Sequence, residues 1–513
     1  MAQQIRQTLT SVRKCAPQDF TGDMLAIGLF KNTKRLPRQF RLLDKAVEGG
    51  ISNLLKLNDF PGETNETLML YLSGNVNFRR MLLVGLGDKN KFDHNILRQV
   101  SGTAVRQAQK LKVARLGMAL HSLSRDVNNR QRLGQVITEG IIVGRYDFQE
   151  YVGERENHKN PPNGRMRVHL LEEINPVLFQ KGQKIGQIVA QAQNITRLIA
   201  DKPPNEINPP ALARLCRKWA RKYAVSCKIF TDKQLKQMGM NAISAVGAGS
   251  ASPPRLIQLQ YHGRKNRKES GTQVDVVLVG KAVTFDSGGL DIKPASYMES
   301  MKFDKCGGCA VLGILCAAAK LQLPLNIVGL IPAVENMPSR SSYRPDDIIR
   351  TYSGKTVEII NTDAEGRMIL SDALTFAHKM NPSTIIDMAT LTGGCKVALG
   401  EHYSGLFGNS KSLIEQLLQA GKAAGEPLWH MPSGPEYLEQ MRSKVADLKN
   451  TGGRYGSPCT AAAFLEEFVA KTDWAHIDIA HTAYTNKEKS YRAGGATGNP
   501  VRLIVEYLRA LGK

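Results

Sequence analysis

The sequence contains no long apolar run. A helix that spans a bilayer needs roughly 18 to 20 uncharged apolar residues, and the best candidates among the 513 residues are strand-length runs such as 276–279. We therefore expect a chain that does not enter a membrane.

Cysteine is scarce, with eight residues spread over the chain. This density is too low for a disulfide scaffold and predicts a reducing compartment. Cys306 and Cys309 form one close pair, but no second Cys/His pair stands at a matching spacing for a zinc site. We interpret both as small buried residues.

The signatures of several enzyme classes are missing. The ten histidines never form H-E-x-x-H, and no Gly-x-Ser-x-Gly is present, which argues against a gluzincin protease and a serine hydrolase. The turn at 85–87 lacks the third glycine of a dinucleotide-binding loop, because Asn90 stands there. The segment 354–356 is similar to the end of a phosphate-binding loop. The motif is incomplete, because Ile349 stands where its first glycine is required.

Acidic residues are few relative to basic ones: 46 Asp and Glu against 69 Lys and Arg give a formal net charge of +23. Such an excess predicts an anionic environment or partner without naming it. Aromatic residues make up only 6% and do not accompany the basic segments. We do not expect nucleic-acid binding to be the main function.

The first acid is Asp19, and residues 1–18 carry three basic residues and no continuous apolar core. This composition resembles a mitochondrial transit peptide, which predicts a mitochondrial location. A basic N-terminus of a cytoplasmic protein is an equally good interpretation.

A chain of this length exceeds one hydrophobic core, so we expect two domains. Apolar runs alternate with helical patterns in both halves, which predicts an α/β fold. The proline-rich segment 201–210 separates a smaller N-terminal α/β domain (19–200) from a larger C-terminal catalytic α/β domain (201–513). The polar stretch 150–167 is predicted to be a surface loop of the first domain.

The C-terminal domain is predicted to contain a mostly parallel central sheet covered on both faces. Its strands are expected at 274–279, 327–331, 357–360, 384–389 and 476–479, with helices at 307–320 and 365–380. Sites in such sheets lie beyond the carboxyl ends of the strands.

Charged residues gather after two of these strands. We expect them to meet at the ends of two strands in one sheet: Lys281, Asp286, Lys293 and Asp304 after the first, and Asp363, Glu365 and Arg367 after the second. Carboxylates without histidine suit hard divalent ions, and four carboxylates balance the charge of two ions. The sequence therefore predicts a dinuclear metal site.

Chemistry suggests a role for each residue type. Asp286 and Glu365 could bridge ions about 3.5 to 4 Å apart, and Lys281 could be a ligand once it is neutral. Lys293 would polarise a substrate carbonyl, and Arg367 would hold a small oxyanion or a carboxylate. A metal-bound hydroxide would attack the carbonyl.

Three segments resemble signatures of the leucyl aminopeptidase family: GKAVTFDSGGLDIKP (280–294), MKFDKCGG (301–308) and NTDAEGR (361–367). The resemblance covers the whole C-terminal part, and more loosely the N-terminal part through MLLVGLG (81–87). It implies a metalloexopeptidase that releases N-terminal amino acids, often leucine, from peptides. It also implies a homohexamer.

The resemblance also implies site residues. One zinc ion is implied at Lys281, Asp286, Asp304 and Glu365. A second, exchangeable ion (zinc, manganese or magnesium) is implied at Asp286, Asp363 and Glu365. Lys293 and Arg367 are the implied catalytic residues, with bicarbonate on Arg367. The implied substrate pocket contains Met301, Asn361, Thr390, Leu391 and Gly393.

Some positions depart from the family pattern. Ala282 stands where glycine is commoner, and Arg340 and Arg350 add charge. His481 replaces a glycine beside the implied pocket, so we expect it to disfavour leucine relative to smaller or polar residues. The chain is also similar to sperm-type leucyl aminopeptidases, which keeps a structural packing role open, and its charge keeps open DNA binding by a basic hexamer.

Overall fold

The computed structural model describes residues 8–73, 75–123, 129–152, 166–264 and 273–512. By contacts the chain forms two compact units, 1–194 with 486–494 and 195–485 with 495–513, and each is described by itself. Most of the loop predicted at 150–167 lies outside the described residues. Within the described ranges, every helix is too short or too polar to cross a membrane.

The first unit is built on a six-stranded sheet in the order β1-β6-β5-β2-β4-β3. All neighbours are parallel except β3 and β4. The strands are β1 (Leu9–Arg13), β2 (Met24–Leu29), β3 (Thr67–Tyr71), β4 (Arg80–Gly85), β5 (Arg115–Ala119) and β6 (Arg167–Leu171). The helices are α1 (Arg41–Ala46), α2 (Gly50–Leu57), α3 (His94–Lys110), α4 (Arg130–Gly144) and α5 (Pro176–Asp201), which continues into the second unit.

Both faces of this sheet are buried. Met24 and Ala26 of β2 belong to one hydrophobic cluster, whereas Leu25 and Ile27 belong to another. Successive side chains of a strand point to opposite faces, so the two clusters lie on the two sides of the sheet. This explains why β2 is a continuous apolar run instead of an alternating one.

The edge strand β1 falls inside the segment that resembles a transit peptide. It pairs in parallel with β6, with Leu9 opposite Arg167 and Arg13 opposite Leu171. Residues 9–13 therefore belong to the sheet of the first unit, while residues 1–7 lie outside the described part.

The second unit contains a nine-stranded sheet in the order β16-β15-β18-β14-β9-β11-β8-β7, with β10 paired to β11. Most neighbours are parallel, as predicted, and the antiparallel pairs are β15 with β18, β11 with β8, and β8 with β7. The strands are β7 (Ser226–Thr231), β8 (Arg255–His262), β9 (Val276–Gly280), β10 (Ala282–Asp286), β11 (Asn326–Asn336), β14 (Thr384–Ala389), β15 (Ser404–Gly408), β16 (Leu428–His430) and β18 (Asp473–Asp478).

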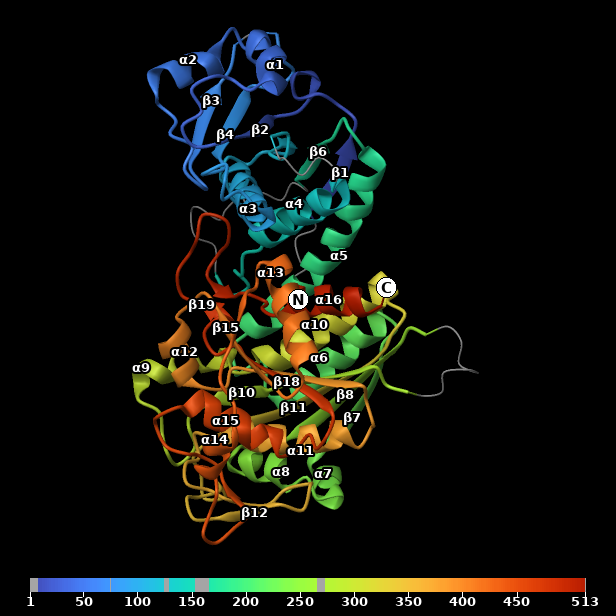
Figure 1. Cartoon of the computed structure of the whole chain (residues 1–513), viewed down its shortest axis with the longest axis vertical. Helices are drawn as coiled ribbons and strands as arrows, with labels where there is room; N and C mark the ends of the chain where they lie inside the picture. The colour runs from blue at the N-terminus through green and yellow to red at the C-terminus, as the bar shows by residue number, and fades with distance from the viewer. Residues whose placement is uncertain (1–7, 74, 124–128, 153–165, 265–272, 513) are drawn as a thin grey trace. The chain divides into compact units, whose positions relative to one another are not determined.

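Helices cover both faces of this sheet. Figure 1 shows α6 and α10 on one side of the strands, and α8 and α11 on the other. The helices are α6 (Pro209–Lys222), α7 (Asp232–Met238), α8 (Asn241–Val246), α9 (Ala295–Met298), α10 (Cys306–Leu321), α11 (Glu365–His378), α12 (Gly393–Leu399), α13 (Lys411–Ala424), α14 (Pro435–Glu439), α15 (Ser457–Glu466) and α16 (Val501–Leu511). The predicted arrangement of two α/β domains with mostly parallel sheets is confirmed.

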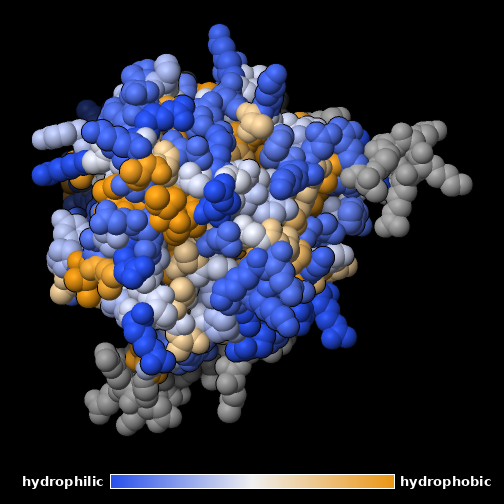
Figure 2. All heavy atoms as spheres, turned by 90° about the horizontal axis from the view of Figure 1, so that it is seen from below, coloured by the Kyte–Doolittle hydropathy of each residue, from blue (hydrophilic) through white to orange (hydrophobic). Residues whose placement is uncertain are grey.

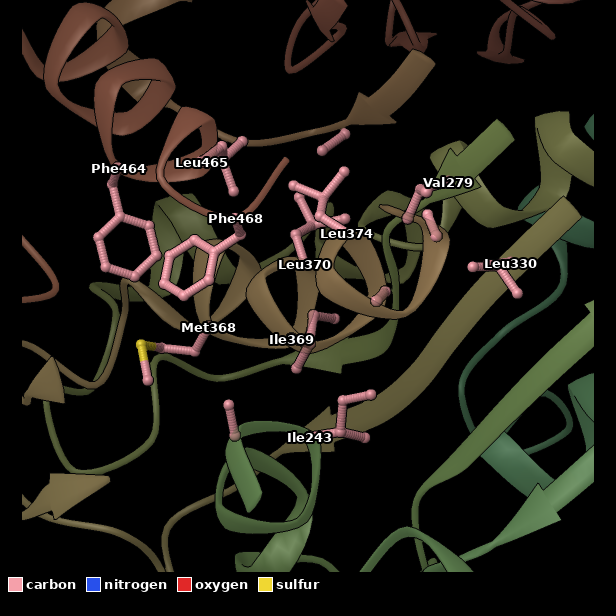
Figure 3. Close-up of a cluster of buried hydrophobic side chains, with 14 of the residues drawn as sticks. Ile243, Val279, Leu330, Met368, Ile369, Leu370, Leu374, Phe464, Leu465 and Phe468 are labelled. Carbon is pink, nitrogen blue, oxygen red and sulfur yellow. The ribbon is translucent and has the colours of Figure 1, made fainter. Parts of the chain in front are cut away.

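The core of the second unit surrounds α11, whose side chains are buried on nearly all sides. Figure 3 shows Leu370 and Leu374 of α11 near Leu465 and Phe468, with Ile243 of α8 below the helix. Burial of each side chain of this size contributes about 1.5 to 3 kcal/mol to the free energy of unfolding. This packing holds the first turn of α11, which carries Glu365 and Arg367, in a fixed place.

One expectation about the sheet is wrong. The strand before Asp363 is β13 (Thr356–Glu358), which lies in a separate sheet between β12 (Ile348–Arg350) and β17 (Leu448–Lys449). A short apolar run predicts a strand but not its partners, which are set by contacts distant in sequence. In the described part of the chain, β19 (Tyr484–Thr485) and β20 (Gly495–Ala496) form a separate antiparallel pair.

Candidate metal centre

Three carboxylates from two segments meet in the second unit. Asp286 ends β10, Glu365 begins α11, and Asp363 lies in the loop just before α11. One oxygen of each lies within 4.8 Å of the others. Asp286 and Glu365 are buried, whereas the side chain of Asp363 is 34% exposed. The centre is therefore enclosed by protein and open at Asp363.

Lys281 joins this group to a fourth carboxylate. Its Nζ lies 2.7 Å from Glu365 Oε1 and 3.0 Å from Asp304 Oδ1, and it donates a hydrogen bond to the carbonyl of Thr390 at 2.9 Å. Burial lowers the pKa of Lys281, but the attraction of Asp304, Glu365 and Asp286 outweighs burial and raises that pKa. Without bound ions, Lys281 is a cation surrounded by these three carboxylates.

Small residues make the approach of Lys281 possible. A Cβ added to Gly366 would lie 2.7 Å from Lys281 Nζ. A Cβ at Gly307, in the first turn of α10, would lie 2.1 Å from the carbonyl oxygen of Met388. Real Cβ atoms do not approach so closely, so a side chain at position 366 would displace Lys281, and one at position 307 would clash with the backbone of β14.

Lys293 contacts the other two carboxylates. Its Nζ lies 2.9 Å from Asp286 Oδ2 and also contacts Asp363 Oδ1. Burial lowers its pKa, and attraction by Asp286, Glu365 and Asp363 reverses this and raises it. Lys293 is therefore charged.

The carboxylates repel one another. Burial, followed by the charges of Glu365 and Asp286, raises the pKa of Asp363 to about 7 against the attraction of Lys293. Burial is also the largest cause of the raised pKa of Asp304 and of Glu365. Four carboxylates thus face two lysines, Lys281 and Lys293. We call these six residues the cage; its acidic groups outnumber its cations.

These residues fit divalent ions. Asp304 Oδ2 is buried and has no hydrogen-bond partner within the described part of the chain. Its other oxygen accepts a hydrogen bond from Thr390 Oγ1 at 2.6 Å, which fixes the orientation of the carboxylate. Oriented carboxylate oxygens in excess of local positive charge are what hard divalent ions bind.

Arg367 lies two residues after Glu365 and is buried. Its Nη1 has no hydrogen-bond partner among the residues that the structure describes. Burial lowers its pKa to about 10, against the attraction of Glu365 and Asp478, so it is charged at neutral pH. The structure therefore brings six of the seven predicted residues together, as two groups of direct contacts whose carboxylates lie within 4.8 Å of one another. It places the seventh, Arg367, two residues after Glu365 in the first turn of α11.

The predicted pocket residues, with His481, lie on four segments. Met301 begins the short helix 301–303 before Asp304, and Asn361 Oδ1 accepts a hydrogen bond from Asp363 N at 2.7 Å. Thr390 touches Asp304, and Leu391 and Gly393 follow it at the end of β14. The ring of His481 is buried and its Nε2 lies 2.9 Å from the carbonyl oxygen of Tyr403.

Sequence analysis missed Asp478, the last residue of β18. Its carboxylate accepts hydrogen bonds from the backbone N–H groups of Leu391 and Thr392 at 3.2 and 3.1 Å, and from Thr392 Oγ1 at 2.7 Å. It thus shapes the loop that contains three of the predicted pocket residues. The sequence signal for it is an acid in the mostly apolar segment WAHIDIA (474–480), which also contains His476.

Comparison with protein-family models decides between the possible uses of this centre. A model of the catalytic domain of the cytosol aminopeptidase family matches residues 194–505, and a model of the N-terminal domain of that family matches residues 26–154. The chain belongs to the cytosol aminopeptidase family.

Whole-length relatives agree with this membership. The chain is 39% identical over 482 residues to a probable cytosol aminopeptidase of Sulfurihydrogenibium, covering 94% of each chain. It is 42% identical over 473 residues to one of Aquifex aeolicus, covering 91% of this chain and 92% of the other.

Solved structures agree as well. A tomato leucine aminopeptidase mutant superposes with a TM-score of 0.88 at 29% identity, covering 99% of this chain and 98% of that one. The bottromycin maturation enzyme BotP in complex with Mn has a TM-score of 0.83 at 30% identity, covering 96% of this chain and all of that one.

Membership confirms the resemblance seen in the sequence. Cytosol aminopeptidases are dinuclear metal-dependent exopeptidases that act on peptides, and this chain is a metalloexopeptidase of that kind. Among the described residues, Asp286, Asp363 and Glu365 form a group that could hold a metal ion.

Proposed function

We propose that the cage binds two divalent ions per chain with separate ligand sets. The first ion, zinc, would be held by Lys281, Asp286, Asp304 and Glu365. The second, exchangeable ion would be zinc, manganese or magnesium, held by Asp286, Asp363 and Glu365. The observation that carries this proposal is that Asp286, Asp363 and Glu365 place oxygens within 4.8 Å of one another, while Lys281 spans Asp304 and Glu365.

Bound ions would neutralise the carboxylates and acidify a water molecule at neutral pH. Two side chains of the protein would stabilise the charges that develop in the reaction. Lys293, charged and beside Asp286 and Asp363, would donate a hydrogen bond to the carbonyl oxygen of the scissile peptide as negative charge develops there. Arg367 would offer Nη1, which has no hydrogen-bond partner among the described residues, to a small anion such as bicarbonate.

The substrate would be a peptide with a free N-terminus. A free α-amine can bind in the centre while the adjacent carbonyl lies beside Lys293, so the terminus itself sets which bond is cleaved. Met301, Asn361, Thr390, Leu391 and Gly393 would line the side-chain pocket, because Thr390 and Asn361 already contact residues of the centre.

His481 is expected to tune this pocket. His481→Gly adds volume and removes a polar ring, so the variant should prefer leucine over alanine more strongly than the parent does. One methylene in an apolar pocket changes selectivity by about 1 to 3 kcal/mol, which predicts a shift of roughly tenfold or more in relative kcat/KM. Steady-state kinetics with leucine and alanine p-nitroanilides measures it.

The control for this prediction is His402→Gly, because His402 is exposed and lies close in sequence to the Tyr403 carbonyl that His481 contacts. It should leave the substrate profile unchanged. If the His481→Gly profile also stays unchanged, the histidine does not face the substrate.

We propose that the enzyme is a homohexamer. Large apolar side chains are exposed on the second unit, among them Val397 (88%), Tyr455 (87%) and Val445 (64%). Figure 2 shows hydrophobic patches among hydrophilic residues on one face. Patches of this kind mark interaction surfaces. Light scattering should give a mass about six times the 56.5 kDa chain.

Residues 9–13 are proposed to remain in the mature protein, wherever it is located. Cleavage after residue 18 would remove β1 and leave the edge of β6 unpaired. This favours the cytoplasmic alternative over import with removal of residues 1–18, and the relatives are named as cytosol aminopeptidases. The N-terminus of the protein isolated from its natural source, read by mass spectrometry, tests this.

The aminopeptidase activity is tested with chelator-stripped protein and leucine p-nitroanilide. Zinc, manganese or magnesium is added singly and in pairs, and turnover is measured for each. We expect no turnover without metal and restored turnover with it. Absence of turnover under every metal condition would refute the proposed reaction of this chain.

A further inference from the structure

Two loops carry most of the metal centre, and one residue joins them. Thr362 lies in the loop before α11, next to Asp363, and its Oγ1 donates a hydrogen bond to the carbonyl of Gly288 at 2.6 Å. Its backbone N–H donates to Asp291 Oδ2 at 2.7 Å, and the N–H of Asp291 donates back to Thr362 Oγ1 at 2.9 Å. The loop that follows Asp286 is thereby tied to the loop that contains Asp363.

The carbonyl of Thr362 is also held. It accepts hydrogen bonds from Tyr343 Oη at 2.5 Å and from Asn336 Nδ2 at 3.1 Å. The same Asn336 Nδ2 donates to Asp286 Oδ1 at 2.9 Å. One buried amide group therefore contacts both the carboxylate of Asp286 and the backbone immediately before Asp363.

All three residues are enclosed: Thr362 is 0%, Asn336 1% and Tyr343 5% exposed. Their hydrogen bonds do not depend on a bound ion. Together with Lys293, which contacts both carboxylates, they act against the repulsion between Asp286 and Asp363. The network and Lys293 thus hold the two loops together before any ion binds.

We propose that Thr362, Asn336 and Tyr343 form a clasp of positioning residues that sets the affinity of the exchangeable metal site. This rests on the proposed function, in which Asp286 and Asp363 share that ion. The first site depends on Asp304, Lys281 and Glu365 as well, so it depends less on the distance between the two loops. Loss of the clasp should lower the affinity of the exchangeable site for its ion and leave the affinity of the first site unchanged.

Groups that orient metal ligands typically change metal affinity by 10 to 100-fold when they are removed. Thr362→Val keeps the shape of the side chain and removes its hydroxyl, so we expect the affinity for the second Mn²⁺ ion to fall in that range. Thr362→Ser restores the hydroxyl and should restore the affinity. Tyr343→Phe removes one donor and should give a smaller loss in the same direction.

A matched control is Thr375→Val. Thr375 is a buried threonine of α11 whose Oγ1 donates to the carbonyl of Ser371 at 2.9 Å, away from both loops. Both threonine variants lose one buried hydroxyl, so both should lose thermal stability. Only the clasp variant should lose metal affinity, which separates positioning from a merely structural role.

The experiment titrates the full-length, chelator-stripped protein with Mn²⁺ by calorimetry and follows free Mn²⁺ by electron paramagnetic resonance. We expect two ions for the parent, and a weaker second ion for Thr362→Val and Tyr343→Phe but not for Thr375→Val. Unchanged affinity in both clasp variants overturns the clasp alone. Fewer than two ions on the parent protein overturns the proposed dinuclear function, and the clasp with it. If Thr362→Val does not fold, Tyr343→Phe decides.

Discussion

Asp363→Ala is expected to lose the exchangeable ion and to abolish turnover. Asp363 is the most exposed of the four carboxylates, and its pKa is already raised to about 7 by burial and by its neighbours Glu365 and Asp286. Removing it takes one of three proposed ligands from the second ion. The affinity for that ion should fall by more than the roughly 10 to 100-fold that orienting groups contribute.

Metal content per chain and turnover of leucine p-nitroanilide, measured on one preparation, test this expectation. The metal content should fall from two ions to one, and turnover should fall to background. Asp347→Ala is the control, because Asp347 pairs with Arg344 in an exposed turn of the same unit. Activity and metal content retained in Asp363→Ala would remove Asp363 from the ligands.

Lys293→Ala should leave both ions bound and still lower the rate strongly. Lys293 contacts Asp286 and Asp363 as a cation, so its removal leaves the carboxylates more anionic and should keep or strengthen metal binding. The variant loses a charged donor to the developing oxyanion. Loss of one such donor lowers kcat by about 10² to 10³-fold.

The measurement is again metal content with kcat and KM. Lys411→Ala is the control, because Lys411 is exposed at the start of α13. A lower metal content in Lys293→Ala would make this lysine a ligand. A normal kcat with both ions present would remove it from the reaction.

Much of the fold could be predicted from local patterns. The continuous apolar run at 276–279 identified β9, because a strand that is covered on both faces has no polar side. The sheet that contains β13 could not be predicted, since its partners β12 and β17 come from distant parts of the chain.

The centre was predictable to a similar extent. The charged residues of NTDAEGR (361–367), and those that follow the strand at 274–279, were identified because so many charged residues rarely follow two strand ends. Asn336 and Tyr343 were not identified, because a single polar residue in a strand or loop has no local signature. Their roles depend on which backbone groups the fold brings within 3 Å, such as the Thr362 carbonyl.

The most direct test of the account is a Mn²⁺ titration of the chelator-stripped parent protein with leucine p-nitroanilide turnover measured at every point. We predict that two ions bind per chain and that turnover rises with occupancy of the second, weaker site. Full turnover with a single ion, or with none, would contradict the assignment of Asp286, Asp363 and Glu365 to a dinuclear centre.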